Sequence, residues 1–167
     1  MKYNAIINTQ FSLEATTEPV SIAEAKEHLR LSADNFDEEA IIMRLIKTAR
    51  LQCERYTALS LINRTVKVVL INGLGGIKLP YGPVKVIASV KDFDTLLLLT
   101  DYQSANGIVK TYFEDSLEFE YTAGFTVIPD DIKTAILMQV DWLYNNRGSD
   151  ARAVEPPYKT QLSKYVA

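Results

Sequence analysis

The stretch DEEAIIMRLIKTARLQCERYT, residues 37–57, decides how the chain folds, because it predicts one long helix without Gly or Pro. Its apolar side chains recur at the spacing of one helix face and form a single stripe, which Ile42 and Ile46 widen: Ile41, Leu45, Ala49, Cys53 and Tyr56. Acidic residues fill the first turn, where they complement the positive end of the helix dipole. The polar face is basic and carries Arg44, Lys47, Arg50 and Arg55. We therefore expect a helix that packs along one face and exposes the other.

A shorter helix is predicted just upstream, over residues 21–31. Ser21 and Glu24 have the spacing of a capping box, in which each side chain bonds the backbone amide of the other residue. Residues 1–19 are polar and irregular, which indicates an N-terminal arm whose one candidate strand covers residues 5–8. The order is thus an arm, a short capped helix and a long helix.

Pro129 begins a third helix, predicted over residues 129–147, because a proline costs nothing in a first helical turn. Apolar residues surround most of this helix, which predicts a central position with neighbours on more than one side. It closes with DWLYNNRG, residues 141–148, whose Trp, Tyr and Arg raise the question of a ligand site. Arg147 and Gly148 suit the last turn and the residue after it, so we interpret this cluster as a helix end.

Between the second and third helices the hydrophobic period changes to that of strands. Strands are predicted over residues 65–71, 77–79, 84–93, 96–100, 108–113 and 117–122. Their links are too short for crossover helices, which favours antiparallel pairing. The predicted fold class is therefore mostly α with an inserted small antiparallel β region (α+β), with three main helices and a short C-terminal helix.

The predicted organisation is a single domain between two terminal extensions. Its parts are an arm (1–19), a domain (20–148, with the β region at 63–124), and a linker with a tail helix (149–167). The tail helix follows a stiff Pro156-Pro157 pair and carries four apolar or aromatic residues: Tyr158, Leu162, Tyr165 and Val166. Such a tail is suited to docking on a partner, and packing on its own domain is an equal alternative.

Composition limits the classes of function. The 167 residues carry a net charge of −3, whereas a protein that holds nucleic acid by its phosphates usually has a basic surplus, so only a local basic patch stays open. Cys53 is the single cysteine, so no intramolecular disulfide forms. No signal-peptide core and no membrane-length apolar run is present, which predicts a soluble protein made in the cytoplasm.

Residues that could carry chemistry have structural explanations. His28 is the single histidine and has only Glu24 and Glu27 near it in sequence, which indicates a solvated helix face rather than a metal site. The acids at 34–39 fail the calcium-loop spacing, and the glycines at 73–76 lack the Gly-Lys-Ser/Thr of a phosphate-binding loop. Cys53 lies on an apolar stripe, which predicts an inert thiol. We expect no catalytic residue, no metal and no cofactor.

Two segments resemble the phage head–tail connector family, adaptor proteins that form a ring under the portal of tailed bacteriophages. The first is EPVSIAEAKEHLRLSADNFDEEAIIMRLIKTARLQCERYTALSLI, residues 18–62. The second is EYTAGFTVIPDDIKTAILMQVDWLYNNR, within residues 118–147, where a strand, an Ala-Gly-aromatic turn and a Pro-led helix follow one another. Residues 63–117 match only in being β-rich. One departure is Ala58-Leu59, where many members of the family have Gly-Arg.

The resemblance implies a virion protein of the head–tail junction, made in the host cytoplasm. It implies a ring of about a dozen subunits between the portal and the tail-completion (stopper) protein, with DNA passing through the lumen without specific binding. We expect Arg44, Lys47 and Arg50 to meet acidic groups of the neighbouring subunit, with Arg147 also at the subunit interface. Tyr158, Leu162 and Tyr165 form the candidate portal-binding tail. The alternatives are a small DNA-binding module and an uncharacterised enzyme of phage origin.

Overall fold

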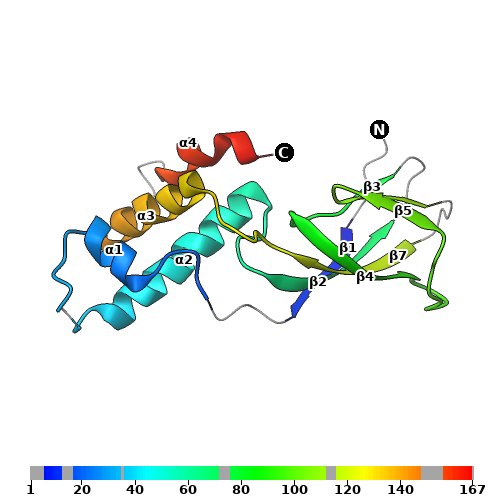
Figure 1. Cartoon of the computed structure of the whole chain (residues 1–167), viewed down its shortest axis with the longest axis horizontal. Helices are drawn as coiled ribbons and strands as arrows, with labels where there is room; N and C mark the ends of the chain where they lie inside the picture. The colour runs from blue at the N-terminus through cyan, green and yellow to red at the C-terminus, as the bar shows by residue number, and fades with distance from the viewer. Residues whose placement is uncertain are drawn as a thin grey trace. The chain divides into compact units, whose positions relative to one another are not determined.

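The structure is a computed structural model that describes residues 6–12, 17–34, 36–71, 76–111, 116–147 and 156–166 (Figure 1). Contacts divide the chain into two compact units, which we name the β unit and the helical unit. The β unit comprises Met1–Thr16 and Ile62–Thr126, and the helical unit comprises Thr17–Leu61 and Val127–Ala167. The chain therefore passes between the units three times. The predicted division into an arm, one domain and a tail stays a prediction.

The prediction of a mostly α fold with a small β insertion is wrong. The described residues form four α-helices and seven strands, about 36% helical and 30% strand, and the strands make two antiparallel sheets. The sequence pattern places only a short strand at residues 5–8, where β1 covers Ile6–Ser12, and it does not predict β5 (Tyr102–Ala105). Both strands are largely polar, so the hydrophobic alternation that identifies a strand is weak in them.

The larger sheet has the order β1-β2-β7-β4, with every neighbouring pair antiparallel, as the short links predict. A smaller sheet has the order β3-β6-β5. Asn106 and Gly107, both with positive φ, form the turn between β5 and β6. The remaining strands are β2 (Arg64–Ile71), β3 (Ile77–Lys78), β4 (Val84–Asp92), β6 (Ile108–Thr111) and β7 (Ser116–Ala123).

Both sheets of the β unit contribute side chains to one apolar core. β7 lies inside the larger sheet and buries Phe119 and Tyr121 completely. The smaller sheet adds Ile77 and Val109 to the same core. The Tyr121 hydroxyl donates to the carbonyl of Pro80 at 2.5 Å, so this polar atom has a partner, and burial raises the pKa of the phenol.

A glycine follows β7 because no side chain fits there. Gly124 has a φ of +128°, and a Cβ at this position would lie 2.4 Å from the carbonyl oxygen of Ile62. The Gly124 amide donates to the carbonyl of Pro83 at 3.0 Å. Gly124 is the glycine of the Ala-Gly-aromatic turn quoted above, so backbone geometry explains this part of the motif.

The helical unit contains α1 (Ile22–His28), α2 (Glu39–Thr57), α3 (Asp130–Asn145) and α4 (Tyr158–Leu162). The predicted capping box is confirmed, because Ser21 Oγ accepts from the Glu24 amide and the Glu24 carboxylate accepts from the Ser21 amide. α3 contacts α1, α2 and α4, as its apolar circumference predicts (Figure 1). No helix in the described ranges is long and apolar enough to cross a membrane.

Ala58 ends α2 in the left-handed conformation, with a φ of 54° and a ψ of 28°. Many helices end on such a residue, which is usually Gly because a Cβ is disfavoured there. This is the position at which the connector-like pattern has Gly and this chain has Ala. The helix therefore keeps the same type of end, at a small conformational cost.

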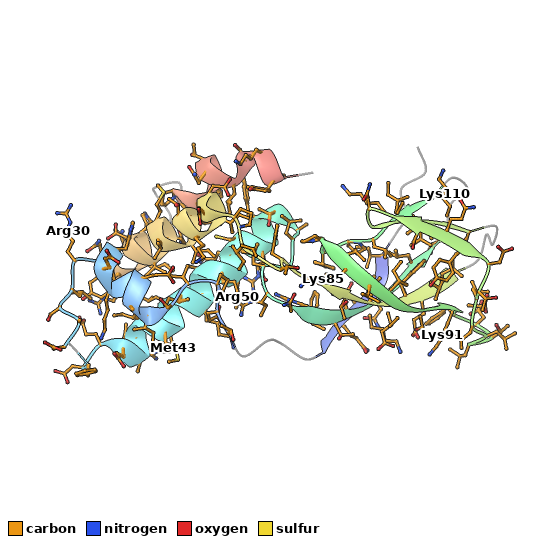
Figure 2. All side chains as sticks on the ribbon, in the orientation of Figure 1. Arg30, Met43, Arg50, Lys85, Lys91 and Lys110 are labelled. Atoms are coloured by element: carbon orange, nitrogen blue, oxygen red, sulfur yellow. The ribbon has the colours of Figure 1, made fainter. Side chains whose placement is uncertain are left out.

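Arg50 of α2 is fully buried (Figure 2). Its guanidinium donates to both carboxylate oxygens of Glu18, at 2.7 and 3.3 Å, and to Glu54 at 2.9 Å. The other oxygen of Glu54 accepts from the Leu61 amide at 2.9 Å. Arg50 therefore joins the first residues of the helical unit to α2 and, through Glu54, to the segment that leaves α2.

We expect Arg50→Ala to destabilise the helical unit by about 3–5 kcal/mol, because it leaves two carboxylates without their buried partner. Arg50→Lys should recover less than half of this loss, since an ammonium does not reproduce the planar bidentate contact. Guanidinium unfolding followed by helical circular dichroism measures both changes. Arg44→Ala, at an exposed arginine of the same helix, is the matched control and should shift stability by less than about 0.5 kcal/mol. Equal effects of the two alanine variants would contradict the structural role of Arg50.

Candidate functional site

The predicted basic face of α2 divides into two parts. Arg44 and Lys47 are exposed, and the exposed Met43 lies beside them on the same side of the helix. Arg50 is instead bonded to two glutamates inside the helical unit. The charge of Arg50 is therefore used within the chain, whereas Arg44 and Lys47 present positive charge at the surface.

Arg147 lies just after the end of α3 and contacts two residues of its own unit. Its guanidinium stacks 4.0 Å from the centroid of the Tyr144 ring and approaches Glu38 at 3.5 Å. The Tyr144 hydroxyl donates to Glu38 at 2.7 Å, and this bond is the main cause of a raised Tyr144 pKa. These contacts tie the end of α3 to the start of α2, and Arg147 stays partly exposed. Gly148 lies outside the described residues.

The C-terminal tail packs on its own unit. Tyr158 and Leu162 are buried, and α4 contacts both α2 and α3. Tyr165 donates its hydroxyl to the Asp131 carboxylate at 2.9 Å, and the Lys164 ammonium lies 2.5 Å from the same carboxylate. Of the two alternatives left by the sequence, intramolecular packing therefore describes the tail in this structure.

A pocket of about 490 Å³ opens between α1 and the segment that leads to α2, and we name it the α1 pocket. It is largely apolar and is lined by Ile22, Ala23, Lys26, Glu27, Leu31, Ala33 and Glu39. The buried Lys26 ammonium bonds the Ala33 carbonyl at 3.1 Å and Glu39 at 2.7 Å, which fixes the segment in place. The sequence pattern does not predict this pocket. The sequence signal that could indicate the pocket is Leu31 and Ala33, two apolar residues in the otherwise polar segment between α1 and α2.

Three consecutive leucines are exposed on the β unit, in the loop after β4. Leu96, Leu97 and Leu98 are 65%, 67% and 65% exposed, and we name them the leucine loop. The sequence predicts a strand over residues 96–100, but the structure places only an isolated bridge there, between Lys91 and Leu98. A run of large apolar side chains in water is typical of an interaction surface.

The structure offers little for catalysis or metal binding in the ranges that it describes. No group of three or more His, Cys, Asp and Glu side chains in these ranges is placed to hold a metal ion. His28 is exposed in the last turn of α1. Cys53 is buried, and burial raises the pKa of its thiol to about 12, so the thiol is not ionised near neutral pH.

No protein-family model and no curated protein matches the chain. Among solved structures, a chain in the neck of an empty gene transfer agent (GTA) particle, computed with C6 symmetry, has a TM-score of 0.73 at 20% identity and covers 96% of both chains. A chain in the neck of the native particle, computed with C12 symmetry, has a TM-score of 0.71 at 17% identity and covers 95% of both. A chain in the virion of the native particle has a TM-score of 0.70 at 20% identity, covering 93% of this chain and 94% of that one. These likenesses show the fold along nearly the whole chain.

We expect Asp131→Asn to loosen the tail, because it removes the charge that Lys164 and Tyr165 contact. Hydrogen exchange of residues 158–165 measures this and should become severalfold faster. Asp130→Asn is the matched control, since Asp130 stands in the same first turn of α3, and it should leave the exchange unchanged. Equal acceleration by both variants would show that the helix dipole, rather than the tail contact, is responsible.

The same contact should depend on pH. Hydrogen bonds from Lys164 and then Tyr165 hold the pKa of Asp131 below its usual value of 3.8. The contribution of this carboxylate is therefore complete above about pH 4 and is lost as the pH falls through the lowered pKa. After correction for intrinsic rates, tail exchange in the unmodified chain should approach that of Asp131→Asn in this acid range.

Proposed function

We propose that the chain is a structural protein of the head–tail junction of a phage-like particle, an adaptor that forms a ring beneath the portal. The observation that carries this proposal is the match of fold, over nearly the full length of both chains, to chains of GTA particle necks. Those necks were computed with C6 and C12 symmetry, which supports a closed ring of about a dozen subunits. The ring would join the portal to the tail-completion (stopper) protein.

The placement of the two connector-like segments supports the same proposal. Residues 18–62 and 118–147 lie far apart in the sequence, yet they supply α1, α2 and α3 of one compact unit. The segment between them, which matches the connector pattern only in being β-rich, forms most of the β unit. The resemblance thus covers the three main helices of the helical unit, together with β7 and the Gly124 turn at the end of the β unit.

Passage of DNA through the ring is compatible with the charge of the chain. A conduit works best when the DNA does not adhere to its wall, and a net charge of −3 supplies no general attraction for phosphates. We therefore propose a lumen that lets DNA pass without specific binding. A gel shift with duplex DNA at low salt distinguishes this from a DNA-binding module, which would give a salt-sensitive complex.

The proposed subunit interface is narrower than the basic face predicted from sequence. Arg44 and Lys47 remain candidates for this interface because they are exposed. Arg147 also remains a candidate because its side chain is partly exposed. Arg50 does not, since it is buried with its own carboxylate partners. A portal contact through Tyr158 and Leu162 requires the tail to leave its own unit, whereas Tyr165 is partly accessible as it stands.

The central test is assembly. We expect the full chain to form rings of about a dozen subunits, either alone or on the purified portal protein of the same particle. Mass photometry across a concentration series, with negative-stain microscopy of the portal mixture, measures the size and closure of the complex. A strict monomer in both conditions would contradict the proposal.

Charge reversal tests the proposed interface. We expect Arg44→Glu together with Lys47→Glu to weaken ring formation at least tenfold, because both charges would then repel the acidic groups of a neighbour. Arg55→Glu, at another exposed position of α2, is the matched control and should assemble normally. Unchanged assembly of the double variant would remove this face from the interface.

A further inference from the structure

We propose that the leucine loop of one copy inserts into the α1 pocket of a second copy. This inference rests on the proposed function, because it names a contact that joins neighbours in the ring. The two surfaces are different parts of one chain, so the contact is heterologous. Repetition of a heterologous contact around an axis is the arrangement that generates a closed ring.

The leucine loop is held open by its own backbone. The Leu96 amide donates to the Asp92 carbonyl at 2.9 Å, and the Asp92 amide donates to the Leu97 carbonyl at 3.0 Å. Leu96 has a φ of 58°, in the left-handed region that a leucine seldom adopts. The loop is thus a folded element that presents three apolar side chains to water in a defined conformation, and an uncommon backbone conformation of this kind is typical of binding sites.

The α1 pocket has the size and character to receive these side chains. Its volume of about 490 Å³ lies in the range of pockets that hold small organic ligands, so it has room for more than one leucine. Ile22, Ala23 and Leu31 give it apolar walls. The ammonium of Lys26 is neutralised by Glu39 and sits close to the Phe36 ring, so insertion of a leucine does not strand an unpaired ammonium.

Opposite charges stand beside the two surfaces. Asp94 is exposed and adjoins the leucine loop in sequence. Arg30 is exposed, directly precedes Leu31 of the pocket, and projects away from the helices (Figure 2). Glu27, an exposed residue of the pocket lining, carries the same charge as Asp94. The loop of a second copy therefore enters with Asp94 on the side of Arg30, where a carboxylate meets a guanidinium, rather than in the reverse orientation, where it meets Glu27. This complementarity within a single sequence is the reason to assign the occupant as another copy of the chain.

Matched substitutions in the full chain test the contact. Leu97→Asp places a charge on the loop, and Ala23→Arg obstructs the pocket. Each should weaken self-association about 10-fold to 100-fold in sedimentation equilibrium, the loss that corresponds to failing to bury one leucine. Val127→Asp is the control, because Val127 is 81% exposed and belongs to neither surface. All three positions are on the surface, and circular dichroism verifies that each variant is folded.

A mixing experiment identifies the second copy as the occupant. The loop of Ala23→Arg and the pocket of Leu97→Asp are both intact, so the two variants should form one-to-one dimers but nothing larger. If the loop instead inserts into the pocket of its own copy, mixing the two variants produces no dimer. Failure to form mixed dimers would therefore overturn the inference. The charge pair is tested in the same way: Arg30→Asp and Asp94→Arg should each weaken association, and the doubly substituted chain should regain it.

The outcomes separate this inference from the proposed function. If Leu97→Asp and Ala23→Arg assemble as the unmodified chain does, the contact is wrong while the ring stands. If they form rings but fail only to bind the portal, the portal is the occupant and the inference is overturned. A chain that stays monomeric alone at all concentrations also overturns it, whereas loss of portal binding as well would contradict the proposed function itself.

Discussion

The guanidinium of Arg50, withdrawn from water, constrains the whole helical unit. A buried charge is tolerated only when opposite charges and hydrogen bonds surround it, and here Glu18 and Glu54 provide them. Glu18 stands at the entrance to the helical unit, and Leu61, held by Glu54, stands at the exit toward the β unit. The ion cluster therefore fixes where the chain enters and leaves this unit, and the apolar stripe of α2 packs within that frame.

The helices are predictable from the sequence because their signals are local. The Ser21–Glu24 capping box and the Pro129 start of α3 each depend on residues within a few turns of one another. The apolar periodicity of α2 is equally local, but the stripe predicted from it is displaced: Ile42, Ile46, Ala49 and Cys53 are buried, whereas Ile41, Leu45 and Tyr56 are half-buried. The burial of Arg50 is not predictable in this way. Its main partner, Glu18, lies 32 residues upstream, and the one local signal that separates Arg50 from the exposed Arg44 and Lys47 is Glu54, four residues later.

The β unit and the candidate contact surfaces are also not predictable from local sequence, because they depend on contacts between distant segments. β1 is a polar strand that exists because it pairs with β2, more than fifty residues later in the chain. The four leucines from Leu96 to Leu99 have the composition of a buried strand, and only the fold places three of them in water. The α1 pocket likewise depends on how the segment after α1 folds over Lys26. Both candidate surfaces therefore depend on tertiary structure, which the local sequence pattern does not determine.

The register of the larger sheet brings together the two ends of the segment inserted between α2 and α3. β2 and β7, the strands nearest the two ends of the Ile62–Thr126 insertion, pair with each other, and Arg64 lies opposite Ala123. For a flexible loop, the entropy lost on closure grows with loop length. Here the sheet itself brings the ends of the insertion together, so α2 and α3 are joined as if by a connection of only a few residues. The β unit can therefore gain or lose loops between its strands without imposing an entropic penalty on the folding of the helices.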